Sequence, residues 1–256
     1  MIQIICQMEY AFCTASVAPL RKEPSHRSEM VSQLLLGETG KVISVENDFV
    51  AIESTYDGYV GWIQKKQIVI QSFLPKQDGY FLNAIQDLFF NHSSCRVSIG
   101  TPYYNDKIIL DKTQISYPFI QEHLLGYTEK NILTLLEHYM HTPYLWGGKS
   151  CFGIDCSGLT QQVFKIMGIW LPRDAYQQIE LGEEVAFISE AKTGDLAFFD
   201  NGEGKIIHVG VMVNNINIIH ASGTVRLDKI DMGGIIHGET GERTHKLRIV
   251  KRMKGY

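Results

Sequence analysis

The sequence predicts an α+β domain in its second half, preceded by one or two small β-barrels. Three observations support this fold class. Short β-favouring runs separated by turns fill the first half, apolar residues at helical spacing begin near residue 129, and strand-like runs follow the helices. Helices followed by an antiparallel sheet are typical of the α+β class. The chain has 256 residues, 45% of them hydrophobic, which suffices for one large domain or two to three small ones.

The first half divides into two β-rich segments. In the first, turn signals at Asn47-Asp48 and Asp57-Gly58 separate strands expected at 42–45, 49–52 and 59–63. The second segment is shorter and less regular, Pro118 closes it, and its strands are expected at 95–99, 102–104 and 108–110. We therefore predict three domains: a small barrel over 1–75, a second, divergent barrel over 76–125, and the α+β domain over 126–256.

The second half begins with two helices. Thr128 is expected to cap the first, whose apolar residues recur at helical spacing until Pro143 stops it. The second should begin at Cys156 or Ser157 and end at Gly168. A polar helical segment is expected at 176–181, and strands are expected at 195–199, 206–213, 216–221 and 247–251.

Cys156 is the candidate nucleophile. A cysteine at a helix start has free backbone N–H groups and the positive end of the helix dipole nearby, which favours its thiolate. The alternative is that Cys156 is a small buried hydrophobe. A polar helix start between Gly153 and Gly158 is a poor place for a packing cysteine, so the nucleophile is the favoured interpretation. Cys151, in the same loop, is interpreted as a bystander.

Two downstream histidines can complete the site. His208 would be the general base that takes the thiol proton, and His220 would hold its tautomer through a hydrogen bond. The alternative is that His208 is an ordinary core residue of an apolar strand. Whether the two meet depends on the turn between their strands. A three-residue loop at 213–215 would set them directly opposite on one face, whereas a two-residue loop would put them on opposite faces.

Two further features near the nucleophile have open roles. Tyr144 could be a core residue, or its hydroxyl could stabilise an oxyanion beside the Cys156 N–H. Arg173-Asp174 follows a proline, and a solvated loop is the simpler interpretation of such a charged pair.

Six motifs occur in a fixed order: Tyr144-Leu145-Trp146-Gly147-Gly148, Asp155-Cys156-Ser157-Gly158, Leu171-Pro172-Arg173-Asp174-Ala175, Gly194-Asp195-Leu196-Ala197-Phe198-Phe199, His208-Val209-Gly210-Val211 and Ile219-His220-Ala221-Ser222. This series resembles the NlpC/P60 family of papain-like bacterial cell-wall peptidases. The resemblance covers roughly residues 126–256. It implies a papain-like α+β catalytic domain with Cys156 as nucleophile, His208 as base and His220 as the orienting residue.

Residues 14–75 resemble a bacterial SH3-like barrel, through the runs at 28–33, 37–38 and 57–62. Together with the ending Thr244-His245-Lys246-Leu247-Arg248, they resemble the subgroup of γ-D-glutamyl-L-diamino-acid endopeptidases, also called dipeptidyl-peptidase VI. The resemblance implies release of L-Ala-γ-D-Glu from murein peptides that carry a free N-terminal L-Ala, with no cofactor. It leaves open whether the third residue is meso-diaminopimelate or L-Lys.

The resemblance also implies a substrate pocket. The Asp155 carboxylate, beside the nucleophile, would hold the substrate ammonium and set the distance to the scissile bond. The same pocket would be lined by Ser157, Asp174 and Ala175. The first barrel would contribute an acidic group and a tyrosine that block longer chains, expected to be Glu29 and Tyr59, with Glu38 and Tyr56 as alternates.

Composition bears on partners and location. The net charge of −4 and the pI of about 6.1 suggest no nucleic-acid partner. No apolar run approaches the ~20 residues that span a bilayer. Residues 1–18 contain Glu9 and lack a basic start, so we expect a strand there rather than a signal peptide. Five irregularly spaced cysteines argue against a disulfide framework, and a reducing cytoplasm fits best.

Three alternative functions are weighed against the cysteine peptidase. Cys156, His208 and His220 could ligate zinc, with a water in the fourth position, although their spacing contains no familiar ligand pair. The chain could be a non-catalytic binder of wall peptides. It could also be an exported wall DL-endopeptidase that acts on intact peptidoglycan stems, which the expected absence of a signal peptide disfavours.

Overall fold

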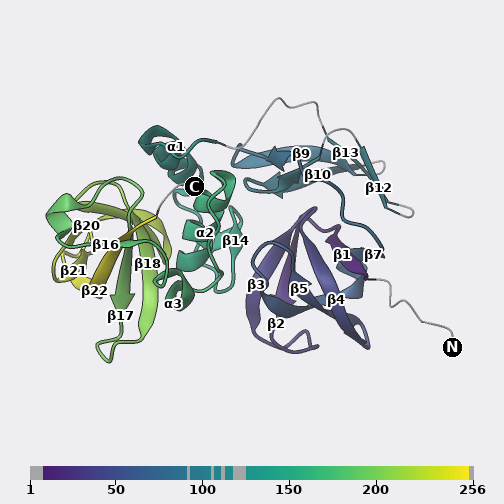
Figure 1. Ribbon diagram of the computed structural model, residues 1–256, viewed down its shortest axis with the longest axis horizontal. Coiled ribbons are helices and arrows are strands. Elements are labelled where there is room, and N and C mark those ends of the chain that lie inside the picture. The colour runs from purple at the N-terminus through teal and green to yellow at the C-terminus, as the bar shows by residue number, and fades with distance from the viewer. Residues whose placement is uncertain (1–7, 91–92, 105–106, 111–112, 118–124, 254–256) are drawn as a thin grey trace. The chain divides into compact units, whose positions relative to one another are not determined.

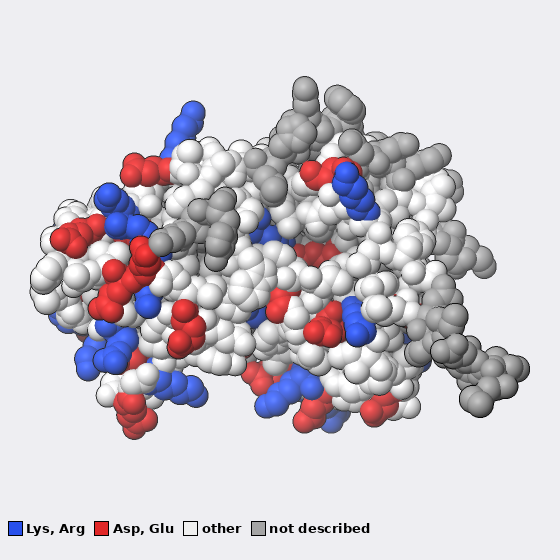
Figure 2. All heavy atoms as spheres, in the orientation of Figure 1, with Lys and Arg blue, Asp and Glu red and all other residues white. Residues whose placement is uncertain are grey.

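The computed structural model describes residues 8–90, 93–104, 107–110, 113–117 and 125–253. The chain forms two compact units, Met1–His123 and Leu124–Tyr256, which are described separately (Figure 1). Within the described residues, no helix is both long and apolar enough to cross a membrane. On the face shown in Figure 2, Lys and Arg side chains lie among Asp and Glu side chains, so both signs of charge are mixed there.

The first unit contains a seven-stranded antiparallel sheet that curls around an apolar core. Its strand order is β3-β2-β6-β5-β4-β1-β7. The strands predicted at 42–45 and 49–52 are confirmed within β4 and β5, and the one predicted at 59–63 is β6, which begins and ends one residue later. The strand expected within 1–18 is interrupted, since β1 ends at Cys13 and β2 begins at Val17. The elements are β1 (Tyr10–Cys13), β2 (Val17–Arg21), β3 (Met30–Leu35), β4 (Thr39–Glu46), β5 (Phe49–Ser54), β6 (Val60–Gln64), the 3-10 helix η1 (Lys65–Gln67) and β7 (Ile68–Gln71).

The rest of the first unit packs on this sheet. The strands are β8 (Gly79–Tyr80), β9 (Ile85–Phe90), β10 (Ser93–Ser98), β11 (Pro102–Tyr103), β12 (Lys107–Leu110) and β13 (Thr113–Ser116). They form one four-stranded and one two-stranded sheet. Their apolar core includes Phe12 of β1 and Leu36 of the turn after β3, and the Tyr104 hydroxyl donates to the Gly37 carbonyl at 2.7 Å. A separate barrel over 76–125 stays a prediction, and Pro118 lies outside the described residues.

The second unit begins with the helices that the sequence predicts. Thr128 caps α1 (Glu129–Tyr139) by accepting a hydrogen bond from the Asn131 N–H at 3.2 Å. The next helix, α2 (Cys156–Ile166), is buried along its whole length and is followed by Gly168 with a φ of 77°. The helix expected at 176–181 is only α3 (Ala175–Gln178). Residues 180 and 181 instead make tighter bonds to carbonyls three residues back, just before Gly182 turns the chain.

The helices of the second unit pack against an antiparallel barrel. The main sheet has the order β16-β22-β17-β18-β19-β20-β21, and a pairing of β21 with β22 closes six of its strands (Figure 1). Apolar side chains from each of the seven strands contribute to one core, among them Phe199, Met212, Ile218, Ile230 and Val250. The elements are β14 (Lys149–Ser150), β15 (Gly153–Ile154), β16 (Glu183–Val185), the 3-10 helix η2 (Ile188–Glu190), β17 (Leu196–Asp200), β18 (Ile206–Met212), β19 (Asn217–Ser222), β20 (Thr224–Asp231), β21 (Gly234–Ile236) and β22 (Arg243–Arg252).

Candidate active site

Cys156 is the first residue of α2 and lies against β18. The helix packs on this strand, and the backbone N–H groups of Val209 and Ser157 hydrogen-bond to the Cys156 sulfur. Since Val209 follows His208 in β18, the thiol and the predicted base come from adjoining elements. The helix start requires Gly158, because a Cβ at that position would lie 2.2 Å from the Gly148 carbonyl oxygen. The loop before the nucleophile therefore packs directly on the first turn of the helix.

Asp155 is the N-cap of α2, and protein donors occupy both of its carboxylate oxygens. Oδ1 accepts from the Gly158 N–H at 2.7 Å, and Oδ2 accepts from the Gly147 N–H at 2.8 Å. The Arg173 guanidinium binds both oxygens, at 3.0 and 2.6 Å. The carboxylate is buried and saturated, which argues against the predicted contact with a substrate ammonium. We instead assign Asp155 to positioning the nucleophile.

Arg173 corrects one interpretation made from the sequence. A solvated loop was expected, but the Arg173 side chain is 1% exposed and forms a buried ion pair with Asp155. Its Nη1 also donates to the Ser157 hydroxyl at 2.9 Å. Ser157, predicted to line the substrate pocket, is buried in the same network. The sequence around Arg173 gave no sign of this burial, because the ion-pair partner lies 18 residues away.

The two histidines lie on the same face of the β18–β19 hairpin, as the predicted site requires. They are not directly opposite, because Gly210 is the residue paired with His220. The expected loop at 213–215 is shifted by one residue, since Val213 pairs with Asn217. The Asn214 side chain explains the shift: its carbonyl oxygen accepts from the N–H of the residue two positions on, which shapes the turn.

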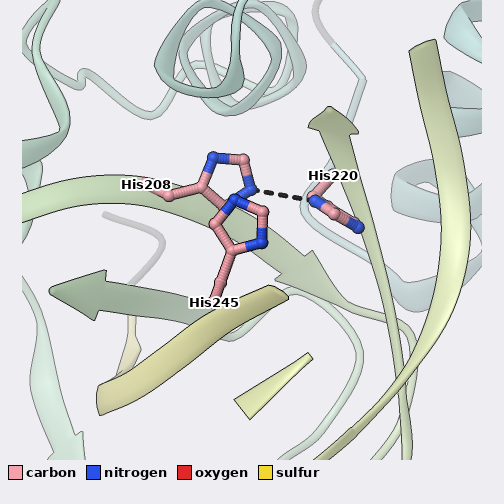
Figure 3. Close-up of side chains that lie close together, drawn as sticks. All are labelled: His208, His220 and His245. Carbon is pink, nitrogen blue, oxygen red and sulfur yellow. Dashed lines mark hydrogen bonds between the residues drawn. The ribbon is translucent and has the colours of Figure 1, made fainter. Parts of the chain in front are cut away.

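His208 and His220 meet diagonally across the space left by Gly210. The His208 Nε2 and the His220 Nδ1 are 2.9 Å apart (Figure 3). A Cβ at position 210 would lie 2.7 Å from the Ile218 Cδ1 and 2.9 Å from the His220 Cβ, so a larger residue would force these side chains to shift. Gly210 is thus part of the reason why the two imidazoles can hydrogen-bond.

Asp228 extends the pair into a chain of hydrogen bonds from His208 through His220 to Asp228, here called the relay. The sequence interpretation missed Asp228. Its Oδ2 lies 3.0 Å from the His220 Nε2, and the Arg226 Nε donates to the same oxygen at 2.8 Å. The Asp228 pKa is lowered overall: burial raises it, but hydrogen bonds from Arg226, His220 and Gly238 outweigh that effect. The one signal in the sequence is an acidic residue that shares the inward alternation of Ile230.

An ionised Asp228 fixes the protons along this relay. It accepts the His220 Nε2–H, so His220 Nδ1 carries a lone pair and accepts the Nε2–H of His208. His208 Nδ1 is then left as a proton acceptor. Burial, together with His220 and His245, holds the His208 pKa well below its ordinary value, and burial lowers that of His220 to about 4. Both imidazoles are therefore neutral at pH 7.

The resting state of Cys156 differs from the thiolate expected at a helix start. Burial, and next the Asp155 charge, raise the pKa of the thiol to about 12, and the hydrogen bonds from Val209 and Ser157 only partly offset this. At neutral pH the site thus holds a thiol beside a neutral imidazole. The thiolate has to form by proton transfer during the reaction.

Tyr144 lies beside the thiol, half-buried. Burial, then the nearby Cys156 and Asp155, raise the pKa of its hydroxyl to about 12. The hydroxyl stays protonated near neutral pH and can donate a hydrogen bond. Its backbone N–H donates to the Gly223 carbonyl at 2.8 Å, which ties the residue to the turn between β19 and β20.

The remaining predicted pocket residues fall in both units. Asp174 and Ala175 lie at the start of α3, where Asp174 is partly exposed and accepts a hydrogen bond from Tyr176.

Glu29 is exposed and Tyr59 is partly exposed in the first unit, and their contact with substrate stays a prediction. Of the alternates, Tyr56 is partly exposed, and Glu38 is buried and accepts the Leu35 N–H at 2.9 Å, which is a turn-closing role.

His245 was quoted from the sequence without a role, and it lies on the His208 ring. The two ring centroids are 4.2 Å apart and the planes are 25° from parallel. Among the described residues, the cluster of three possible metal ligands at this site is His208, His220 and His245. Cys156 is not a member, so the zinc set of Cys156, His208 and His220 considered from the sequence is not the one the fold assembles.

Comparison with known proteins identifies the second unit. The NlpC/P60 family matches residues 141–241, which contain Cys156, His208 and His220. The second unit therefore contains the domain of the NlpC/P60 family of cysteine peptidases. The bacterial dipeptidyl-peptidase SH3 domain matches residues 20–68, within the seven-stranded sheet of the first unit. The predicted family, and the fold class of a papain-like domain preceded by an SH3-like barrel, are thus confirmed.

Relatives extend over both matched regions. A γ-D-glutamyl-L-lysine dipeptidyl-peptidase of Bacillus cereus is 27% identical over 257 residues, covering 86% of this chain and 77% of the relative. Dipeptidyl-peptidase 6 of Lysinibacillus sphaericus is 29% identical over 245 residues, covering 81% of this chain and 90% of the relative. The crystal structure of an NlpC/P60 family protein from Bacillus cereus superposes with a TM-score of 0.76 over 95% of this chain and 99% of that one. Because the two sequences are only 21% identical, this structural similarity is evidence for the fold alone.

Proposed function

We propose that this peptidase hydrolyses the γ-D-glutamyl–diamino acid bond of murein peptides with a free N-terminal L-Ala, releasing L-Ala-γ-D-Glu. The relay from Asp228 through His220 to His208, beside Cys156, is the observation that carries this proposal. It supplies a nucleophile and a base for acyl transfer. The two dipeptidyl-peptidase relatives match across most of both proteins, which supports the choice of substrate class.

The first half-reaction forms a thioester. The Cys156 sulfur attacks the γ-carbonyl carbon of D-Glu while its proton passes to the His208 Nδ1. The oxyanion accepts hydrogen bonds from the Cys156 N–H and the Tyr144 hydroxyl. His208 then gives the proton to the leaving α-amine of the diamino acid, and the C–N bond breaks.

The second half-reaction regenerates the enzyme. His208 takes a proton from water, and the resulting hydroxide attacks the thioester carbonyl. The C–S bond breaks, L-Ala-γ-D-Glu leaves, and His208 returns the proton to the Cys156 sulfur. His220 and Asp228 keep the His208 tautomer fixed through both half-reactions, because Asp228 anchors the far end of the relay.

We assign recognition of the substrate ammonium to Asp174 rather than Asp155. The Asp155 carboxylate is buried and held by Arg173 and by backbone N–H groups. Asp174 accepts a hydrogen bond from Tyr176, but its side chain is partly exposed at the start of α3. A carboxylate there can form a charge-assisted bond with the free N-terminus of L-Ala. This contact would place the scissile bond at a fixed distance from the nucleophile.

Digestion of defined peptides, followed by mass spectrometry, tests the proposal. The substrates are L-Ala-γ-D-Glu-L-Lys and L-Ala-γ-D-Glu-meso-diaminopimelate, each with a free and an acetylated N-terminus. We expect cleavage of free peptides only, and at least a 10³-fold loss in Cys156→Ala. Cys151→Ala, in the same loop, is the matched control and should retain activity. Equal cleavage of acetylated peptides would favour an endopeptidase that acts on intact stems, and no cleavage would overturn the proposal.

Asp174→Asn tests the ammonium contact in the same assay. We expect a higher KM for the free peptide with little change in kcat, since the lost interaction is with a part of the substrate that does not react. Asp231→Asn, an exposed aspartate in β20, is the control. An unchanged KM in Asp174→Asn would reject this assignment while leaving the reaction itself in place.

We further propose that the protein acts in the cytoplasm, in recycling of wall peptides. The support is the irregular set of five cysteines, which fits a reducing compartment, and the free N-terminus expected of the substrate. Cell fractionation with an antibody against the protein tests this. Recovery from the culture medium or the wall fraction would reject it.

A further inference from the structure

We propose that His208, His220 and His245 form an inhibitory site for a first-row divalent transition metal ion such as Zn²⁺. The three side chains come from β18, β19 and β22: the His208 and His220 nitrogens face each other, and the His245 ring is stacked on His208 (Figure 3). One ligand nitrogen from each lies within 4.8 Å of the other two. His208 is 5% exposed and His220 1%, so the cluster is set into the barrel rather than spread over its surface.

The chemistry of these donors suits zinc, copper or nickel. Neutral imidazole is a preferred ligand of these ions, and three histidines with one open position are a known zinc arrangement. Ligand nitrogens on a tetrahedral zinc ion lie about 3.3 Å apart, given bond lengths of about 2.0 Å. The His208 Nε2 and the His220 Nδ1 are already 2.9 Å apart. The partly exposed His245 ring, stacked on His208, would have to turn one nitrogen toward the other two to complete the set.

Asp228 gives this cluster a feature that ordinary histidine clusters lack. A metal-bound histidine typically donates its other ring N–H to a carboxylate, which fixes the tautomer and raises the basicity of the ligand. His220 has this arrangement: its Nε2 is bonded to Asp228, and its Nδ1 faces the other two rings. The anchor that prepares His220 for catalysis therefore also prepares it to bind a metal ion.

A bound metal ion would block proton transfer from Cys156. Coordination uses the lone pair of the His208 Nε2, so the single proton of the neutral ring has to sit on Nδ1. With Nδ1 protonated, His208 cannot accept the thiol proton. The ion replaces the hydrogen bond between His208 and His220, and no proton is released in this step.

Calorimetric titration of the metal-free full-length protein with ZnCl₂ tests the binding site directly. We expect one site in the wild type and in Cys156→Ala, and at least about 10-fold weaker binding in His245→Phe. Phenylalanine keeps a ring against His208 but has no nitrogen to offer. His138→Phe, on α1 in the same unit, is the matched control and should bind as the wild type does. Equal Zn²⁺ affinity in His245→Phe and the wild type would overturn the proposal.

The inhibition itself rests on the proposed function and is measured with the peptide substrate. We expect Zn²⁺ to inhibit the wild type reversibly and EDTA to restore activity. In His245→Phe, inhibition is measured relative to that variant's own metal-free activity, and we expect at least a 10-fold higher inhibitory concentration. Activity that EDTA abolishes would overturn the inhibitory role and favour a metal-dependent enzyme. If the metal-free wild type cleaves no peptide, the proposed function fails, while the calorimetry still decides the metal site.

Discussion

Asp228 determines where the protons lie on two neighbouring imidazoles. It is 3% exposed, Arg226 and the Gly238 N–H keep it ionised, and it hydrogen-bonds to the His220 Nε2. An anion at the end of the relay directs one N–H toward itself and leaves an acceptor at the opposite end. The catalytic state of His208 is therefore set by a residue two strands away.

Replacing Asp228 with asparagine should lower activity through the tautomer of His208. The amide can donate as well as accept, so the relay no longer has a single proton arrangement. We expect kcat to fall roughly 10- to 100-fold, with KM nearly unchanged. Loss of the carboxylate that hydrogen-bonds a metal-binding histidine has an effect of this size. Asp231→Asn, the same change in the same strand, is the control. A wild-type kcat in Asp228→Asn would show that the relay does not depend on this carboxylate.

The buried pair of Arg173 and Asp155 should be one of the most sensitive sites for stability. Arg173→Met leaves the Asp155 charge buried without its partner, which typically costs about 3–5 kcal/mol. Arg243→Met is a matched control, because Arg243 also pairs with an aspartate but both side chains are about half exposed. That change should cost about 0–1 kcal/mol. Urea unfolding measures both, and equal losses would contradict the role assigned to Arg173.

At the scale of elements, the β18–β19 hairpin depends on having no side chain at Gly210. We expect Gly210→Ala to cost about 1–3 kcal/mol through overpacking and to lower kcat, because the added methyl group would push His220 away from His208. Gly126→Ala is the control, since a Cβ there would meet nothing within 4 Å. Thermal unfolding and peptide assays measure the two effects. Full activity in Gly210→Ala would mean that the hairpin adjusts without moving the rings.

Helix starts were predicted correctly from the sequence because they depend on residues close to one another in the chain. Thr128 and the turn before Cys156 mark helix starts because a cap acts within three residues. The hairpin register was missed by two residues because the Asn214 side chain reshapes the loop. Strand β20 was not predicted, since buried and exposed residues alternate regularly only in its second half, and Asp228 was overlooked with it.

At the scale of the whole molecule, the residues that the sequence missed are joined to the site by long-range contacts. The pair of Arg173 and Asp155 spans 18 residues, and His245 reaches His208 because β22 pairs with β17, which in turn pairs with β18. Such contacts depend on the strand order of the barrel. The motif resemblance supplied Cys156, His208 and His220, whereas the partners that set their protonation required the fold.

Two buried neutral imidazoles should make the stability of the molecule depend on pH. The pKa of His220 is lowered to about 4 and that of His208 lies well below 6.5, so the unfolded chain binds protons that the folded chain does not. The free energy of unfolding should therefore fall as pH drops below about 6.5, by roughly 3 kcal/mol for His220 alone between pH 6.5 and 4.

Activity should persist to lower pH than an ordinary histidine allows, because His208 stays a proton acceptor until it is protonated. Urea unfolding and kcat/KM from pH 4 to 8 measure the two effects. His220→Gln should flatten the stability curve, whereas His138→Gln should not. Constant wild-type stability between pH 7 and 5 would mean that these rings are protonated in the folded protein.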